Sequence, residues 1–263
     1  MHFTKMHGLG NDYLYYYGEL ANSEEWSRKL SDRHFGIGSD GIITISPSVA
    51  ADFKMRVFNA GGSEAMMCGN GICCVGKYVF DKGYTDKKQL VIETLSGNKF
   101  LSLQTRGGKV TEVTVNMGKC VMDRPISLNT EYGEVQIMPV SMGNPHAVIF
   151  TEDARTAPLT TIGKELEHHP YFKSGVNVEF VQTVERNILK ARVWERGSGI
   201  TMACGSGACA SAAAAIQAGF CDKDSDITVC LDGGNLKIRV SADNTVMMTG
   251  PVKTICECEV EGS

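Results

Sequence analysis

Two cysteines stand in the same short motif, Cys-Gly-x-Gly, at two places in the chain. Cys68 begins CGNG and Cys204 begins CGSG. A run of strand-forming residues precedes each motif and a helix-forming run follows it, so we expect each cysteine at the start of a helix. Free N–H groups and the helix dipole stabilise a thiolate there. The same N–H groups can bind a carboxylate, so each motif offers a base beside an anion site.

The two motifs belong to a longer internal repeat. Residues 54–75 match residues 190–211 at nine of 22 positions without a gap. Such self-similarity predicts two copies of one structural unit. We expect an N-terminal lobe over 1–120, which carries Cys68, and a C-terminal lobe over 121–263, which carries Cys204. The turn-rich segment 119–135, which loses periodicity, should contain the boundary.

Each copy has the composition of a mainly β unit with one buried helix after its motif, and this predicts an α+β fold of two similar lobes. Runs rich in Val, Ile, Thr and Tyr, bounded by Gly and Asn, predict strands. These runs are 12–18, 41–46, 53–59, 89–97, 99–105, 110–117, 134–142, 146–151, 177–184, 189–196, 226–231, 235–240 and 245–250. Helices are predicted over 23–35, 71–82 and 208–218, the last nearly pure alanine and closed by Gly219.

Composition narrows the class of protein. The chain has 26 Lys and Arg against 30 Asp and Glu, a formal net charge of −4, which disfavours a nucleic-acid partner. It has no apolar run of signal-peptide or membrane-span length, so we expect a cytoplasmic protein without a membrane partner. Ten cysteines without a single CxxC disfavour zinc knuckles and thioredoxin-type motifs, so we expect no metal site. The oligomeric state is not fixed by the sequence, and a homodimer is compatible with it.

Two thiols on opposite sides of one bound carboxylate compound would be able to invert the carbon next to the carboxylate. One thiolate removes the α-proton, and the other thiol returns a proton to the opposite face. Donors around the carboxylate stabilise the charge that develops there. The sequence carries no cofactor signature, so we expect none.

The other eight cysteines are interpreted as packing residues, since a free cysteine is usually a small buried hydrophobe. Cys73 and Cys209 match across the repeat and should lie inside the two helices. Cys73 or Cys74 would also be able to pair with Cys68 as a redox sensor, which keeps a second function open. The remaining thiols are Cys120, Cys221, Cys230, Cys256 and Cys258.

Several polar residues near the motifs are weaker candidates. Asparagines at the ends of apolar runs are more often turn formers than ligands; they are Asn11, Asn59, Asn144 and Asn177. The pair Glu195-Arg196 replaces Asn59-Ala60 of the first copy, so the two lobes would present different polar groups at one place.

Six ordered blocks of the chain resemble the diaminopimelate epimerase family, whose enzymes are cofactor-independent and of the two-thiol racemase type. The blocks are HGLGNDY near residue 10, RHFGIGSDGI at 33–42, MRVFNAGGSEAMMCGNGI at 55–72, MGNPHAVIF at 142–150, NVEF at 177–180 and ERGSGITMACGSGACA at 195–210. The resemblance implies two lobes, each wrapping mixed β-structure around a central helix, with residues 256–263 returning to the first lobe. It implies interconversion of LL- and meso-diaminopimelate, on the route to lysine and bacterial cell-wall cross-links.

The resemblance also implies roles for particular residues. Cys68 and Cys204 would be the acid–base pair, and His146 and Glu195 would tune their proton transfer. The α-carboxylate would be held by backbone donors of Gly69, Asn70, Gly205 and Ser206. The rest of the substrate would be bound by six side chains: Asn11, Asn59, Asn144, Asn177, Glu195 and Arg196.

Three residues depart from the family pattern: Ile200, Cys73 and Gly41. None is a proposed acid or base, so they bear on the shape of the pocket and on the substrate. Two alternatives therefore accompany the leading hypothesis. The chain would be a racemase or epimerase of the same fold for another amino acid, or a non-catalytic protein that binds an amino acid.

Overall fold

Two compact units make up the computed structural model, which describes residues 1–261 of the chain. Unit 1 holds Met1–Val115 together with the C-terminal segment from Gly250, and unit 2 holds Asn116–Thr249. The chain is mixed α+β and mostly strand, as the sequence predicts. None of the helices within residues 1–261 has both the length and the hydropathy that a membrane span needs.

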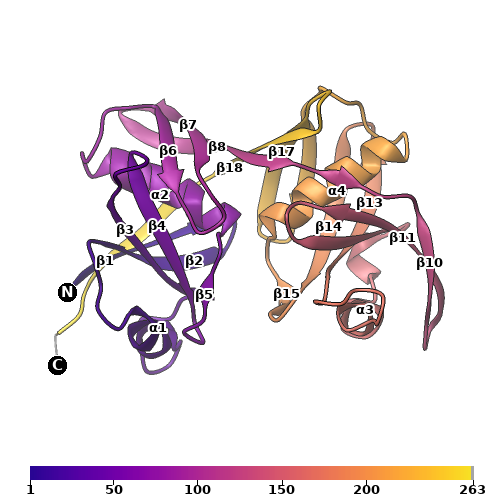
Figure 1. Ribbon diagram of the computed structural model, residues 1–263, viewed down its shortest axis with the longest axis horizontal. Coiled ribbons are helices and arrows are strands. Elements are labelled where there is room, and N and C mark those ends of the chain that lie inside the picture. Colours follow the sequence, from indigo (N-terminus) through magenta and orange to yellow (C-terminus); the bar gives the residue numbers. More distant parts are fainter. Residues whose placement is uncertain (262–263) are drawn as a thin grey trace. The chain divides into compact units, whose positions relative to one another are not determined.

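Unit 1 wraps strands around the helix α2, which Figure 1 shows in its centre. Strand β1 pairs antiparallel with β2 and with β19, β2 pairs parallel with β3, and β3 pairs antiparallel with β4. The two helices are α1 (Ser23–Ser31) and α2 (Gly69–Asp81). The strands are β1 (His2–Gly8), β2 (Asn11–Tyr17), β3 (Gly41–Pro47), β4 (Phe53–Asn59), β5 (Glu64–Ala65), β6 (Gln89–Glu93), β7 (Lys99–Arg106), β8 (Lys109–Lys119), which runs on into unit 2, and β19 (Lys253–Glu259).

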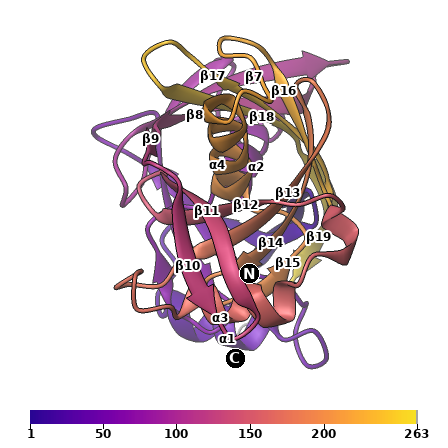
Figure 2. The same cartoon turned by 90° about the vertical axis from the view of Figure 1, so that its right-hand side faces the viewer.

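Unit 2 repeats this plan around the helix α4 (Figure 2). Its strands are β9 (Val121–Met122), β10 (Ile126–Thr130), β11 (Gly133–Ser141), β12 (Pro145–Phe150), β13 (Asn177–Glu185), β14 (Ile188–Glu195), β15 (Gly199–Thr201), β16 (Ile227–Leu231), β17 (Gly234–Val240) and β18 (Thr245–Pro251), which returns the chain to unit 1. Its helical segments are η1 (Ala154–Thr156), η2 (Leu159–Gly163), α3 (Lys164–Glu167) and α4 (Gly205–Gln217).

The two units share one order of strand pairing. In unit 1, β2 and β3 pair parallel, β3 and β4 antiparallel, β4 and β6 parallel, and β6 and β7 antiparallel. In unit 2 the same sequence of pairings joins β12, β13, β14, β16 and β17. The helix with the cysteine motif follows β5 in one unit and β15 in the other. The internal repeat of the sequence is therefore a repeat of topology.

The two central helices are buried because their residues are small or apolar. In α2, Ile72, Cys74 and Val75 have no exposed surface. In α4 the alanines 212–215 are likewise fully buried, and such short side chains let the surrounding strands approach the helix closely. Matching glycines just beyond the two helices, Gly83 and Gly219, take positive φ angles of 79° and 80°, which glycine adopts at little cost at a helix C-terminus.

The structure corrects several predicted elements. The helix predicted over 23–35 ends at Ser31, because the carboxylate of Asp32 accepts the backbone N–H groups of His34 and Phe35, both at 2.7 Å. The segment 119–135, predicted as turns, contains β9 and β10. Strands β1 and β19 were not predicted either. Strand β10 forms by antiparallel pairing with β11, which Figure 2 shows beside it.

The cysteines inside the helices, Cys73 and Cys209, are buried as predicted. All ten cysteines are free thiols. The packing role predicted for Cys256 is wrong, because this residue is exposed on β19. Its sulfur lies 3.6 Å from that of Cys258, two residues along the same strand.

Candidate active site

Each motif cysteine is the N-cap of its helix, which confirms that each lies at a helix start. The helices begin at Gly69 and Gly205, two and three residues before the predicted ranges. Cys68 has an extended backbone, and its sulfur accepts the N–H of Gly71 at 3.3 Å. Cys204 has the same backbone conformation, and its sulfur accepts the N–H of Gly207 at 3.3 Å. Both sulfurs therefore lie at the positive end of a helix, where negative charge is stabilised.

The glycine that donates to each sulfur is closely packed from outside the helix. A Cβ atom on Gly71 would lie 2.6 Å from Cδ1 of Ile43, and a Cβ atom on Gly207 would lie 2.7 Å from Oε1 of Glu179. The fourth residue of each motif must therefore be small. The side chain that approaches it is apolar in unit 1 and acidic in unit 2.

The Cys68 thiol donates to an amide oxygen. Its sulfur lies 3.3 Å from Oδ1 of Asn11, whose Nδ2 donates to a carboxylate oxygen of Asp40 at 2.7 Å. Asp40 also accepts from Arg33 at 3.0 Å. The bond to Asp40 fixes the amide so that its oxygen faces the Cys68 sulfur.

A tyrosine also lies beside Cys68. Tyr13 is 5% exposed. Burial raises the pKa of its hydroxyl well above the ordinary value, and the neighbouring Cys68 sulfur adds to the rise. The phenol therefore stays neutral and can donate to the sulfur as an O–H group.

The other predicted residues of unit 1 lie at strand and helix ends. Gly69 and Asn70 are the first two residues of α2, and Asn70 is buried. Asn59 is the last residue of β4, and its Nδ2 donates to the hydroxyl of Ser63 at 3.1 Å. The structure thus brings Asn11 directly to Cys68 and holds Asn59 in a turn.

Cys204 is more enclosed than Cys68, with 6% of its surface exposed. Burial is the main cause that raises the pKa of its thiol well above the ordinary value, and the nearby Glu195 and Glu179 add to the rise. The hydroxyl of Ser206, 3.6 Å from the sulfur, and the N–H of Gly207 act in the opposite direction. The thiol form is therefore favoured at rest.

A buried histidine–glutamate pair adjoins this cysteine. Nδ1 of His146 lies 2.7 Å from Oε1 of Glu179, and each residue is 1% exposed. Nε2 of His146 lies 3.3 Å from Oδ1 of Asn144. Nδ2 of Asn144 in turn donates to Ser206 at 3.5 Å. Hydrogen bonds thus link the two predicted residues His146 and Asn144 to the helix start.

The predicted residues of the β14–β15 turn are positioned by their neighbours. Oδ1 of Asn177 accepts the backbone N–H of Arg196 at 2.9 Å, and the Arg196 guanidinium donates to the carbonyl of Ser174 at 2.8 Å. The hydroxyl of Thr201 donates to Glu195 at 2.8 Å. Gly205 and Ser206 are the first two residues of α4.

Sequence reasoning missed Tyr13, Asp40 and Glu179. Asp40 lies in the block RHFGIGSDGI, but only the fold shows that it bonds to Asn11. Glu179 had a detectable signal: it is an acid with apolar residues on both sides, Val178 and Phe180, and the 136-residue repeat aligns it with Ile43.

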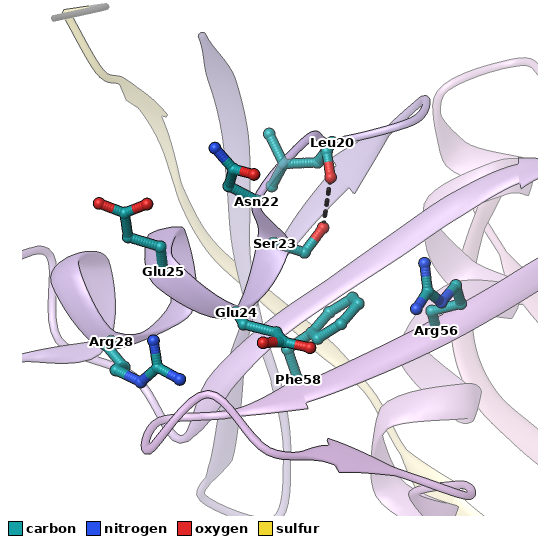
Figure 3. Close-up of a pocket in the computed structure, with 8 residues that line it drawn as sticks. All are labelled: Leu20, Asn22, Ser23, Glu24, Glu25, Arg28, Arg56 and Phe58. Carbon is teal, nitrogen blue, oxygen red and sulfur yellow. Dashed lines mark hydrogen bonds between the residues drawn. The ribbon is translucent and has the colours of Figure 1, made fainter.

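The pocket in Figure 3 lies apart from these residues. It occupies about 470 Å³ against α1 and β4, and none of the predicted site residues lines it. Arg56 lies over the ring of Phe58 there, 4.9 Å from its centroid, and is paired with Glu64. Within the described part of the chain, no cluster of three or more His, Cys, Asp or Glu side chains could hold a metal ion.

Comparison of the sequence with known families gives one clear match. The family model described as diaminopimelate epimerase matches residues 3–122 and 138–255. A diaminopimelate epimerase of Acetivibrio thermocellus is 48% identical, with 99% of each chain covered. The diaminopimelate epimerase of Bacillus subtilis is 46% identical, with 97% of this chain and 96% of the relative covered.

Solved structures share the fold at low identity. A probable proline racemase from Agrobacterium radiobacter has a TM-score of 0.77 at 15% identity, covering 99% of this chain and 92% of that one. A predicted epimerase from Pseudomonas aeruginosa also has a TM-score of 0.77 at 15% identity, covering 100% and 99%. These likenesses support the α+β fold.

Proposed function

The chain belongs to the diaminopimelate epimerase family, and from this premise we propose that it interconverts LL- and meso-diaminopimelate without a cofactor. The observation that carries the proposal is the duplicated cap: each unit presents one cysteine sulfur at a helix start, bonded to the N–H of Gly71 or Gly207. The product would serve the formation of lysine and of cell-wall precursors.

Inversion at one α-carbon needs a base on one face and an acid on the other. The thiolate of one cysteine takes the α-proton and becomes a thiol, and the electron pair of the broken C–H bond moves toward the carboxylate. The thiol of the other cysteine then gives its proton to the opposite face and becomes a thiolate. After one turnover Cys68 and Cys204 have exchanged protonation states, so the reverse reaction uses the same two groups.

We assign the binding roles by the chemistry of each group. Backbone N–H groups of Gly69, Asn70, Gly205 and Ser206 lie in the first turns of the two helices and are suited to the α-carboxylate. The remaining polar groups suit the distal amino-acid end of the substrate. They are Asn11, Asn59, Asn144, Asn177, Glu195 and Arg196.

Chiral chromatography of the reaction mixture tests the function. The purified chain, given either LL- or meso-diaminopimelate alone, should produce the same equilibrium mixture from both. The variants Cys68→Ala and Cys204→Ala serve as matched controls that lose one thiol each. A chain that leaves both diastereomers unchanged would contradict the proposal.

The alternatives give different results in the same assay. A racemase for another amino acid would invert proline, hydroxyproline or glutamate and leave diaminopimelate unchanged. A binding protein would retain meso-diaminopimelate on equilibrium dialysis without inverting it. A redox sensor built on Cys68 and Cys73 or Cys74 would lose free thiols under mild oxidant and would invert nothing.

A further inference from the structure

Unit 2 contains a buried carboxylate that the proposed mechanism leaves unused. Glu179 lies on β13 with 1% of its surface exposed. Its Oε1 faces His146 at 2.7 Å, whereas Oε2 is buried without a hydrogen-bond partner among the described residues. Burying a charged carboxylate costs free energy unless the group is paired, so the presence of Glu179 in the core needs a reason.

Hydrogen-bond contacts hold the His146 ring from both sides. One ring nitrogen faces Oε1 of Glu179, and the other faces the amide oxygen of Asn144. The ring therefore fixes the position of the Glu179 carboxyl group, whose Oε1 lies over Gly207 at the start of α4.

The carboxylate is close to the Cys204 sulfur. Relative to the Cβ position on Gly207, Glu179 Oε1 lies at 2.7 Å and Cys204 Sγ at 3.3 Å. The two atoms therefore lie within roughly the 4–6 Å range in which one charge alters the titration of another. Glu195 of β14 is the other acid that acts on this sulfur, and Ser206 and the N–H of Gly207 are the donors. His146 of β12 is the basic side chain that contacts Glu179.

The first unit shows that the fold does not need an acid here. Ile43 is the repeat equivalent of Glu179, and each side chain lies over the glycine that donates to its cysteine. Ile43 pairs with Tyr15 in the parallel β2–β3 ladder, and Glu179 pairs with Val148 in the parallel β12–β13 ladder. An isoleucine fills this position in one unit without a charge, so packing alone does not account for Glu179.

We propose that Glu179 is a positioning residue that, held in place by His146, keeps Cys204 in its protonated form in the substrate-free chain, so that unit 2 supplies the proton in the direction that starts from this state. The carboxylate opposes a second negative charge on the sulfur. The inference rests on the proposed function for its catalytic meaning, whereas the effect on the thiol stands without it.

Peptide-resolved alkylation measures the thiol directly. The full chain, without substrate, is treated with iodoacetamide at a series of pH values, and modification of the peptide that contains Cys204 is followed by mass spectrometry. Glu179→Gln should shift the midpoint of Cys204 alkylation downward by about one pH unit, because a nearby like charge is removed. Glu179→Ile, which copies the residue of unit 1, should shift it in the same direction.

Two controls separate this effect from a general loss of structure. Glu179→Asp keeps the charge and should restore most of the original midpoint. Asp222→Asn removes an acid elsewhere in unit 2, where it pairs with Arg186 and Asn187, and should leave the Cys204 midpoint unchanged. Unchanged midpoints in folded Glu179→Gln or Glu179→Ile would overturn the proposal.

Kinetics then connect the thiol to turnover. In the direction that uses Cys204 as the acid, the basic limb of the kcat profile should move to lower pH in Glu179→Gln, with KM changed less than about twofold. If the wild-type chain inverts no diaminopimelate, the proposed function fails while the alkylation result still decides the role of Glu179. A shifted alkylation midpoint with an unmoved kcat profile would contradict the catalytic part of the inference.

Discussion

The two cysteine helices share one cap and differ in the side chains around it. Beneath the donor glycine lies Ile43 in unit 1 and Glu179 in unit 2. In the strands that precede these residues, Tyr13 of unit 1 corresponds to His146 of unit 2. Unit 1 places an amide and a phenol beside its sulfur, whereas unit 2 places a histidine–glutamate pair near its sulfur.

This difference shows which part of the duplication is fixed and which part has diverged. The backbone of each cap supplies the same N–H donor at the same 3.3 Å distance. Any difference in proton affinity between the two thiols must therefore come from their burial and from the side chains around them. Two substitutions between the copies, at the positions of Tyr13 and Ile43, replace a phenol and an alkyl side chain by an imidazole and a carboxyl group.

Removal of either sulfur should cause the largest loss of epimerisation activity. The loss should be similar for the two units. Cys68→Ala and Cys204→Ala should each lower the epimerisation rate by at least about 10²-fold, the usual contribution of one acid or base. Chiral chromatography of initial rates measures both. If one variant kept most of its activity, the pairing of the two units in one reaction would be wrong.

Replacing the donor glycine of each cap by alanine should lower the free energy of unfolding by different amounts in the two units. Gly207→Ala places a methyl group 2.7 Å from Oε1 of Glu179, which His146 holds, and should destabilise the chain by about 1–3 kcal/mol. Gly71→Ala shares with Gly207→Ala the contacts to its own cysteine, but its closest contact is the terminal methyl of Ile43, which can turn away, so it should cost less. Urea unfolding of both variants gives the comparison, and equal losses would count against a rigid Glu179.

Loss of the Asn11 amide beside Cys68 should alter the thiol of unit 1 and leave the thiol of unit 2 unaltered. Asn11→Ala removes the acceptor of the Cys68 thiol and should lower kcat about tenfold, as expected for loss of one hydrogen bond of about 1.5 kcal/mol. Alkylation of Cys68 should change with it, and that of Cys204 should not. Asn98→Ala, at an exposed asparagine of the same unit, is the matched control and should leave both unchanged.

The smallest expected effect is on stability and concerns Cys74, a buried thiol whose repeat position in unit 2 holds no cysteine. Burial raises the pKa of Cys74 to about 12, and the repeat equivalent in unit 2 is Ala210. The unfolded thiol ionises near pH 9 while the folded one stays neutral, so this stabilisation is complete below pH 9 and is lost as the pH rises toward 12. Between pH 8 and 9.5 it should fall by about 1 kcal/mol.

Cys74→Ala copies unit 2 into unit 1 and tests this pH dependence. The variant should lose stability less steeply than the wild type between pH 8 and 9.5, as measured by urea unfolding at each pH. Parallel curves for the two proteins would show that the Cys74 thiol ionises alike in the folded and unfolded chain.

Local patterns predicted the strands well, because β-branched and aromatic runs bounded by glycine are strong signals. The predicted strand over 53–59 coincides with β4. Elements that depend on distant partners were missed: β1 and β19 pair with each other across almost the whole chain. The short segments η2 and α3 carry too few turns for helical periodicity to be detected.

The site was predictable where the repeat marks it. Two cysteines in matched motifs identified both helix starts, because a cap is a local feature of sequence. Glu179 and Asp40 contact residues far along the chain, so their positions near the cysteines appear only in the fold. Aligning the copies and looking for charge in one of them would have found Glu179.

The measurement that tests the two-thiol account most directly is isotope incorporation during the first turnovers in deuterated water. The account predicts that meso-diaminopimelate formed from the LL-diastereomer carries one deuterium at its inverted α-carbon, delivered by the second thiol, while unreacted substrate still carries hydrogen. Proton NMR and mass spectrometry of the separated diastereomers report both values. Product that forms without deuterium at that carbon would contradict the account.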